Sequence, residues 1–144
     1  MKTYIVDSST AIKWYIPEIL SNKAVEFLEL SREKKYLLLS PDLIFSEIGN
    51  VLWKKCRRGE LEANDARKII AAINEAFPVQ IASSYQLLPV AFEIANAFER
   101  SVYDSLYLAL AKVKEGILVT ADERLANAMQ NTVLKNAVFF LGDW

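Results

Sequence analysis

Residues 3–9 of the chain read Thr-Tyr-Ile-Val-Asp-Ser-Ser, a short apolar run that ends in an acidic residue and two hydroxyls. Tyrosine, isoleucine and valine favour pleated structure, so residues 3–6 are predicted to form a buried first strand. Residues 8–10 are types that begin helices, and a short helix ending near Pro17 is expected to follow. The opening of the chain therefore predicts a strand and a helix with Asp7 at their junction.

The remaining sequence repeats this alternation of short β-like runs and longer helical patterns. Strands are predicted at 36–39, 78–81, 117–119 and 137–141, and helices at 21–33, 42–57, 62–76, 85–98, 103–115 and 120–130. Strands separated by helices imply crossover connections, so we expect an α/β fold with a mostly parallel sheet. Such sheets bind ligands beyond the carboxyl ends of their strands.

Helical spacing also predicts which side chains face the core. The apolar positions assigned to inner faces are Ala24, Val25, Phe27 and Leu28 in the first long helix, Leu43, Ile44, Ile48, Val51 and Leu52 in the next, and Ala66, Ile69, Ile70 and Ile73 in the one after. Pro41 is expected in the first turn of the helix over 42–57, where a missing N–H costs nothing.

Length and composition limit the classes of protein to consider. With 144 residues, of which 53% are hydrophobic, we expect a single domain over residues 1–144 that has its own core. Seventeen basic and 18 acidic residues give no global attraction to nucleic acid, so any RNA contact needs a local patch or bound cations. No apolar run resembles a signal peptide or a bilayer span, and we expect a cytoplasmic protein without membrane attachment.

The chain contains no histidine and one cysteine, Cys56, and this excludes much of enzyme chemistry. Serine–histidine and cysteine–histidine catalysis, disulfides within the chain and the usual zinc sites are ruled out. An enzyme of this composition has to work with carboxylates, hydroxyls, lysine, arginine or tyrosine. Oxygen ligands of this kind favour Mg²⁺ or Mn²⁺.

Four acidic residues stand apart from the other surface acids: Asp7, Glu47, Asp104 and Asp122. Asp7 and Asp122 follow predicted strands, whereas Glu47 and Asp104 lie in otherwise apolar helices. Phosphodiester hydrolysis needs an activated water and a stabilised leaving oxygen, and carboxylate-bound Mg²⁺ or Mn²⁺ supplies both. We therefore predict that the four acids converge as metal ligands and catalytic groups.

Each acid also has a structural interpretation that leaves its role open. Asp7 could cap the helix that follows it, and Glu47 could lie at the edge of a polar helix face. Asp104 and Asp122 could be first-turn acids favoured by the helix dipole, and Thr120 and Glu123 have the spacing of a capping box. These interpretations do not explain why all four acids lie at element ends or on apolar elements of one sheet.

The ordered set resembles the motifs of PIN domains over nearly the whole chain. Four segments carry the resemblance: Tyr4–Ser9, Pro41–Leu52 with Glu47, Tyr103–Ala111 with Asp104, and Leu118–Leu125 with Asp122. The length of the chain and its lack of added domains are similar to those of the VapC-type toxins of toxin–antitoxin pairs. The resemblance implies a three-layer α/β/α sandwich with a sheet of four to five strands, Mg²⁺ or Mn²⁺ dependence, cleavage of single-stranded RNA, a homodimer and an inhibiting antitoxin.

Several other residues are candidates for contact with substrate or with the acids. Asn50 and Lys54 follow Glu47 by three and seven residues and lie on roughly its helical face. Lys54 is also the first residue of the basic segment 54–58. Ser8 and Thr120 carry hydroxyls beside acids, although helix capping is the simpler interpretation. Cations at a helix C-terminus are likewise favoured without any ligand.

Aromatic side chains and alternative functions complete the set of hypotheses. Trp14, Tyr15, Trp53 and Tyr107 could stack on bases, but core or subunit packing is the simpler role. A dehalogenase-like phosphatase needs a second aspartate at position 9, where this chain has Ser9, and a receiver domain needs an acidic pair. The stronger alternatives are a non-catalytic PIN-like RNA- or protein-binding module and an RNA-processing nuclease outside a toxin–antitoxin pair.

Overall fold

The computed structural model describes all 144 residues and is built on a sheet of five parallel strands. The strands are β1 (Thr3–Val6), β2 (Leu37–Pro41), β3 (Gln80–Ala82), β4 (Ile117–Thr120) and β5 (Val138–Phe140). Their order across the sheet is β3-β2-β1-β4-β5, so β1 is central and pairs with β2 on one side and β4 on the other. The predicted α/β class and parallel sheet are confirmed.

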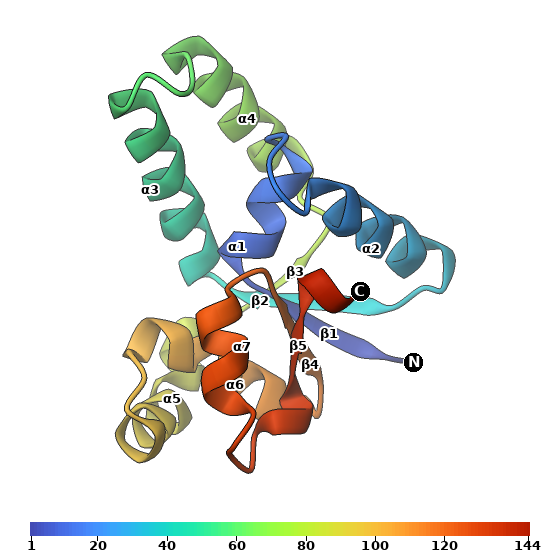
Figure 1. Ribbon diagram of the computed structural model, residues 1–144, viewed down its shortest axis with the longest axis vertical. Helices are drawn as coiled ribbons and strands as arrows, with labels where there is room; N and C mark the ends of the chain where they lie inside the picture. The colour runs from blue at the N-terminus through green and yellow to red at the C-terminus, as the bar shows by residue number, and fades with distance from the viewer.

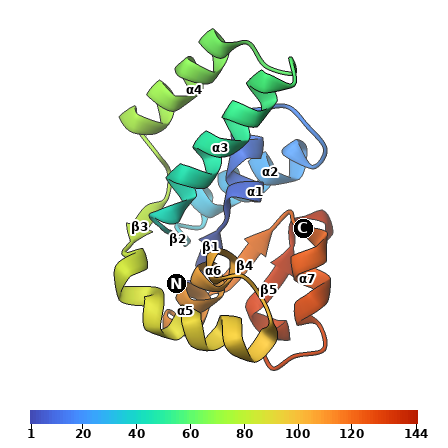
Figure 2. The ribbon, with the colours of Figure 1, turned by 90° about the vertical axis from the view of Figure 1, so that its left-hand side faces the viewer.

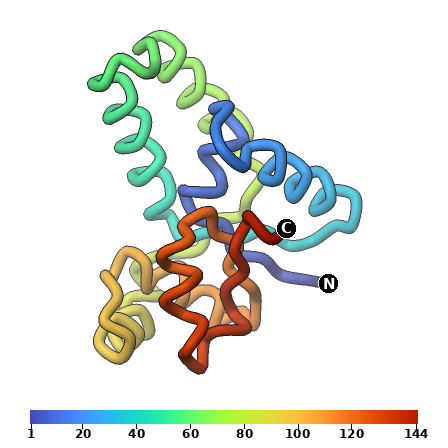
Figure 3. The backbone as a smooth tube through the Cα atoms, in the orientation of Figure 1, coloured from blue at the N-terminus to red at the C-terminus, as the bar shows by residue number.

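Helices cover both faces of this sheet and give three layers (Figure 1). One layer contains α1 (Ser8–Ala11), η1 (Ile12–Trp14), α2 (Ser21–Glu33), α3 (Leu43–Arg57) and α4 (Ala63–Glu75), and the other contains α5 (Ser84–Phe98), α6 (Val102–Val113) and α7 (Glu123–Met129). Short 3₁₀ turns, η2 (Lys135–Ala137) and η3 (Leu141–Asp143), flank β5. The α3–α4 hairpin extends away from the sheet, with its connecting turn at the far end (Figures 2 and 3).

The strand order places a topological switch point at the carboxyl ends of β1 and β4. From β1 the chain passes to β2 and β3 on one side, and then crosses through α5 and α6 to β4 on the other side. Connections therefore leave β1 and β4 in opposite directions, and open α/β sheets bind ligands at such points. Asp7 follows β1 directly and Asp122 lies just beyond β4.

The core is divided by the sheet, and alternate residues of β1 contribute to its two halves. Tyr4 and Val6 pack among α1 to α4, whereas Ile5 packs against α5 to α7. This follows from the period of two in a strand, which sends successive side chains to opposite faces. Because both faces are covered, the central strands are nearly continuously apolar.

Most predicted elements are present, with differences at their ends and faces. Pro41 is the last residue of β2 and not part of α3. Val25 and Ile70 are predicted on inner faces, but they are 39% and 43% exposed because α2 and α4 each turn a narrower apolar stripe to the core. Ile12 is buried in the core, and the Trp14 indole donates to the Ala24 carbonyl at 2.9 Å, a structural role.

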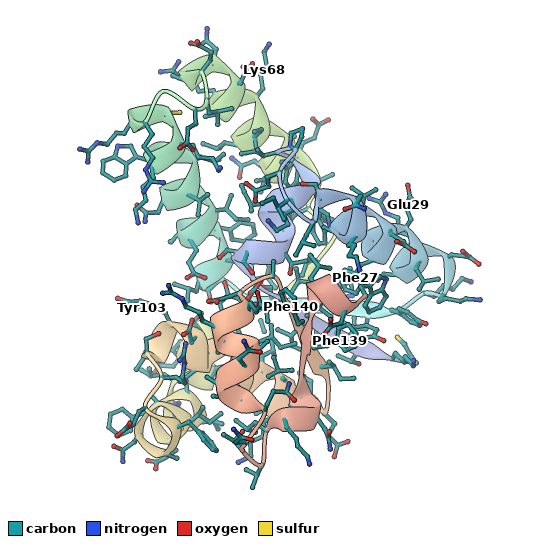
Figure 4. The ribbon with its side chains drawn as sticks, viewed as in Figure 1. Phe27, Glu29, Lys68, Tyr103, Phe139 and Phe140 are labelled. Atoms are coloured by element: carbon teal, nitrogen blue, oxygen red, sulfur yellow. The ribbon has the colours of Figure 1, made fainter.

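An aromatic cluster holds the C-terminal segment against α2 and β1. The ring of Trp144 lies 4.8 Å from Phe27, 5.8 Å from Tyr4 and 5.8 Å from Phe139, all in edge-to-face arrangements. Phe27 and Phe139 are labelled in Figure 4.

None of the helices combines the length and apolar character that crossing a bilayer requires.

The two faces of α2 give the first testable prediction. Phe27 is fully buried, so Phe27→Ala should lower the free energy of unfolding by about 3–5 kcal/mol through lost burial and a cavity. Val25→Ala, two residues away on the exposed side, should change it by only about 0.5 kcal/mol. Urea denaturation of both variants measures this, and similar losses in the two would contradict the core face described.

Candidate active site

Asp7 is a buried carboxylate at the junction of β1 and α1, with 6% of its surface exposed. Its Oδ1 accepts hydrogen bonds from the Ser9 hydroxyl at 2.7 Å and the Thr10 backbone N–H at 3.1 Å. Its Oδ2 accepts from the Thr120 hydroxyl at 2.5 Å. Asp7 does cap α1, as one interpretation predicted, but the cap occupies one oxygen and the other contacts β4.

Glu47 lies in the second turn of α3 and points its carboxylate toward α6. Its Oε1 accepts from the Tyr107 hydroxyl at 2.5 Å and from the Ser8 hydroxyl at 3.4 Å. Tyr107 is 3% exposed, so it cannot stack on a base as one hypothesis proposed. Burial and the charge of Glu47 raise the pKa of Tyr107, which keeps its hydroxyl protonated as a donor to that carboxylate.

Asp104 lies in the first turn of α6 and is paired with an arginine that the sequence interpretation missed. Its Oδ2 is 3.0 Å from Nη2 of Arg100, and its backbone N–H is capped by the Ser101 hydroxyl at 3.1 Å. The spacing of four residues between Arg100 and Asp104 was the available signal. Arg100 brings a positive charge to the margin of the acidic group.

Asp122 differs from the other three acids because it is exposed and its carboxylate is used locally. Its Oδ1 accepts from the backbone N–H groups of Arg124 at 3.1 Å and Leu125 at 3.2 Å, which caps α7. The predicted capping box of Thr120 and Glu123 is therefore wrong. Thr120 instead accepts from the Asp122 N–H at 3.0 Å while donating to Asp7, and so connects the two strand ends.

The carboxylates influence one another, and their pKa values record it. Burial raises the pKa of Asp7 from 3.8 to about 6, against the lowering effect of its hydrogen bonds, and the charge of Glu47 adds to the increase. Burial also raises the pKa of Glu47, and Asp104 contributes through its negative charge. The charge of Glu47 thus opposes the ionisation of Asp7, and the charge of Asp104 opposes that of Glu47.

The chemistry of this donor set fits a hard divalent cation. Every nearby donor is an oxygen, and the chain has no histidine. As the side chains stand, no three carboxylates are arranged to hold one ion. Asp122 uses Oδ1 to cap α7 and Asp104 uses Oδ2 with Arg100, so each keeps an oxygen without a hydrogen bond, whereas both oxygens of Asp7 accept hydrogen bonds.

The remaining candidates divide into two groups. Ser8 and Thr120 belong to the hydrogen-bond network of Glu47 and Asp7. Ser9 was not singled out from the sequence, yet its hydroxyl contacts Asp7 and accepts from the Ala121 N–H at 3.0 Å. Asn50 and Lys54 are exposed on α3 and make no hydrogen bond to the acids.

Comparison with known proteins agrees with this arrangement of motifs. A family model described as the PIN domain matches residues 4–129, which include all four acidic positions. The chain belongs to the PIN-domain family. Within this family it is 35% identical over 123 residues to Ribonuclease VapC3 of Pyrobaculum aerophilum, an alignment that covers 85% of this chain and 91% of that protein.

Solved structures of PIN-type proteins show the same fold. The structure of PAE2754 from Pyrobaculum aerophilum matches with a TM-score of 0.69 at 22% identity, over 99% of this chain and 85% of that one. VapBC2 from Rickettsia felis, bound to a DNA fragment from its promoter, matches with a TM-score of 0.67 at 12% identity, over 96% of this chain and 98% of that one. The fold of this PIN domain is therefore shared at low identity.

The buried carboxylate gives the second prediction. Because its folded pKa of about 6 exceeds the ordinary 3.8, Asp7 stabilises the fold fully below pH 4, and this contribution is lost as pH rises through 6. The loss should reach roughly 3 kcal/mol without metal, and Glu47 adds to it in the same direction. Urea denaturation in EDTA between pH 4 and 7.5 measures the free energy of unfolding.

Asp7→Asn is the matched variant because it removes the titrating group at nearly constant shape. Its free energy of unfolding can differ from that of the wild type at any one pH, since the amide changes the bonds to Thr10 and Thr120. The informative quantity is the slope of the free energy of unfolding against pH, which should be flatter in Asp7→Asn than in the wild type. Parallel curves for the two proteins would show that Asp7 ionises normally in the folded state.

Proposed function

We propose that this PIN domain is a metal-dependent ribonuclease that cleaves single-stranded RNA and acts as the toxin of a toxin–antitoxin pair. The observation that carries the proposal is the position of Glu47 between Asp7 and Asp104 near the switch point of the sheet: burial raises the pKa values of Asp7 and Glu47, the charge of Glu47 raises that of Asp7 further, and the charge of Asp104 raises that of Glu47 further. A cluster of carboxylates that resist ionisation together is stabilised by cations. The relative named Ribonuclease VapC3 supports cleavage of RNA as the reaction.

In this proposal the residues that would hold Mg²⁺ or Mn²⁺ are Asp7, Glu47, Asp104 and Asp122. When bound, such an ion supplies an activated water for in-line attack and neutralises charge on the phosphate. The chain's own groups orient the ligands: Thr120 fixes Asp7, and Tyr107 fixes Glu47. We propose that residues 1–144 form one PIN-like domain around these ligands.

Arg100 has a defined place in this scheme. Its guanidinium neutralises Asp104 through one oxygen, Oδ2, and would be released if a metal ion took over that neutralising role. A released arginine at the margin of the site stays within reach of a negatively charged substrate. Asp122 caps α7 through Oδ1 alone, so Oδ2 is the oxygen that this residue would offer to a metal ion.

The third prediction tests the reaction itself. Asp7→Asn and Asp104→Asn should each slow cleavage of unstructured RNA more than about 100-fold, since residues that only orient metal ligands already cost about 10–100-fold. EDTA should abolish the activity, and Mn²⁺ should restore part of it in the variants. Glu29→Gln is the matched control, because Glu29 is an exposed acid on α2 (Figure 4).

The same assay separates the mechanism from alternatives. With no histidine in the chain, the two-histidine route of metal-independent ribonucleases is closed. Attack by water does not need the RNA 2′-hydroxyl, so a 2′-deoxy substitution at the cleaved position should slow the reaction without stopping it. Undiminished cleavage in excess EDTA, or full activity in Asp104→Asn, would contradict the proposal.

An antitoxin is the proposed regulatory partner, and both proteins would act in the cytoplasm. The support is the likeness in fold to the toxin–antitoxin pair VapBC2. A segment carrying arginine or lysine would pair with the carboxylates of the site, as Arg100 pairs with Asp104, and would in this way compete with metal. Purification from the native host should therefore yield a bound protein partner.

We also propose a homodimer, which the exposed side of α5 supports. Tyr85, Leu88 and Phe92 are 87%, 49% and 58% exposed, and their spacing places them along one face of this helix. An apolar stripe of this kind on a surface is typical of protein contact.

The fourth prediction concerns this stripe. Light scattering at tens of micromolar should give the mass of a dimer for the wild type and of a monomer for the double variant Leu88→Glu with Phe92→Glu. Val133→Glu is the control, since Val133 is 90% exposed outside α5 and should leave the dimer intact. A monomeric wild type would contradict the proposed assembly.

A further inference from the structure

The C-terminal half of α3 carries an exposed cationic and aromatic surface outside the acidic site. Trp53, Lys54, Arg57 and Arg58 form it, and we call these four residues the α3 basic face. They line a hollow of about 290 Å³ that contains no acidic residue. Arg57 lies over the ring of Trp53, with 5.0 Å between its guanidinium carbon and the ring centroid.

The cations of this face are free of acidic partners, unlike the lysine beside them. Lys55 is paired with Glu18 at 3.2 Å and Glu60 at 3.8 Å, so its charge is largely satisfied within the protein. None of Lys54, Arg57 and Arg58 is within 4.0 Å of a carboxylate. In a chain with a net charge of -1, this is a local positive field.

Trp53 adds a feature that helix capping does not explain. Its indole is 53% exposed at the surface of a hairpin that extends away from the sheet. Cations in the last turn of a helix are favoured by the dipole alone, but a half-exposed tryptophan among them gains nothing from it. Exposed aromatic rings beside arginine are the platforms on which unpaired bases stack.

The α3 basic face is continuous with the acidic site along one helix. Asn50, Lys54 and Arg58 follow Glu47 by three, seven and eleven residues and therefore lie on its side of α3. At 1.5 Å per residue, Arg57 lies about 15 Å along the axis from Glu47. Figure 1 shows α3 running from the sheet toward the tip of the hairpin. A chain bound at the acids can thus extend along this face.

We infer that the α3 basic face binds the single-stranded RNA that flanks the cleaved linkage. Lys54, Arg57 and Arg58 would contact phosphates, and Trp53 would stack on a base. This inference rests on the proposed function for the site but concerns binding and not chemistry. RNA fits better than an acidic peptide, because the surface combines unpaired cations with an aromatic ring and leads to a phosphodiester site.

The test measures binding of a fluorescent single-stranded RNA of about 20 nucleotides, longer than a typical site on such surfaces. Binding is measured by fluorescence anisotropy in EDTA, which keeps the RNA intact because it removes the metal that cleavage needs. Arg57→Gln with Arg58→Gln should weaken binding roughly tenfold at low salt and reduce the slope of log affinity against log salt by about 1.4. Lys112→Gln with Lys114→Gln is the control, because it removes two exposed cations at the end of α6.

Trp53 provides an independent measurement. RNA should quench the tryptophan fluorescence of the wild type, and Trp53→Phe should lose most of this quenching while it retains a ring for stacking. Trp53→Ala should weaken binding about fivefold or more. Trp53 and both arginines are exposed, so the variants should remain folded. Circular dichroism and thermal melting check this.

The outcomes separate this inference from the proposed function. If the wild type cleaves RNA and the arginine variant binds it as the control does, the inference is wrong and the proposed function stands. If the arginine variant binds RNA normally but changes the mass of the protein in light scattering, the face is a protein contact and the inference again fails. If the wild type binds RNA without cleaving it and the arginine variant loses this binding, the result supports RNA binding by the α3 basic face and contradicts the proposed function.

Discussion

The hydrogen bond from Thr120 to the buried carboxylate of Asp7 joins the two strand ends on which the site depends. It connects the last residue of β4 to the residue after β1, at the topological switch point of the sheet. Ser9 and the first turn of α1 satisfy the other oxygen. A buried carboxylate is tolerated only with such partners, so β1, α1 and β4 are fixed relative to one another.

Burial at this junction has an electrostatic consequence that shapes the remaining site. Asp7 and Glu47 both resist ionisation, and Asp104 adds negative charge beside them. The protein meets part of this cost with its own groups: Tyr107 donates to Glu47 and Arg100 pairs with Asp104. The arrangement thus holds like charges together at the expense of stability, which is typical of sites built for a cation and not for the fold.

The fold was largely predictable from local signals. The alternation of strands and helices gave the parallel sheet, and the position of Asp7 after β1 placed it at the sheet edge. Face assignments were less reliable, as Val25 and Ile70 show, because helical spacing gives a stripe but not its width. Arg100 and Ser9 were missed because their roles arise from contacts and not from residue type.

The sequence by itself determined the α/β class, the exclusion of histidine-based chemistry and the membership of the PIN family, since apolar periodicity, the lack of histidine and ordered motifs are properties of the chain alone. Only the tertiary structure decided which hydroxyl holds which acid. Thr120 is 113 residues from Asp7, and Tyr107 is 60 from Glu47. Contacts over such separations depend on strand order and helix packing, which no local pattern encodes.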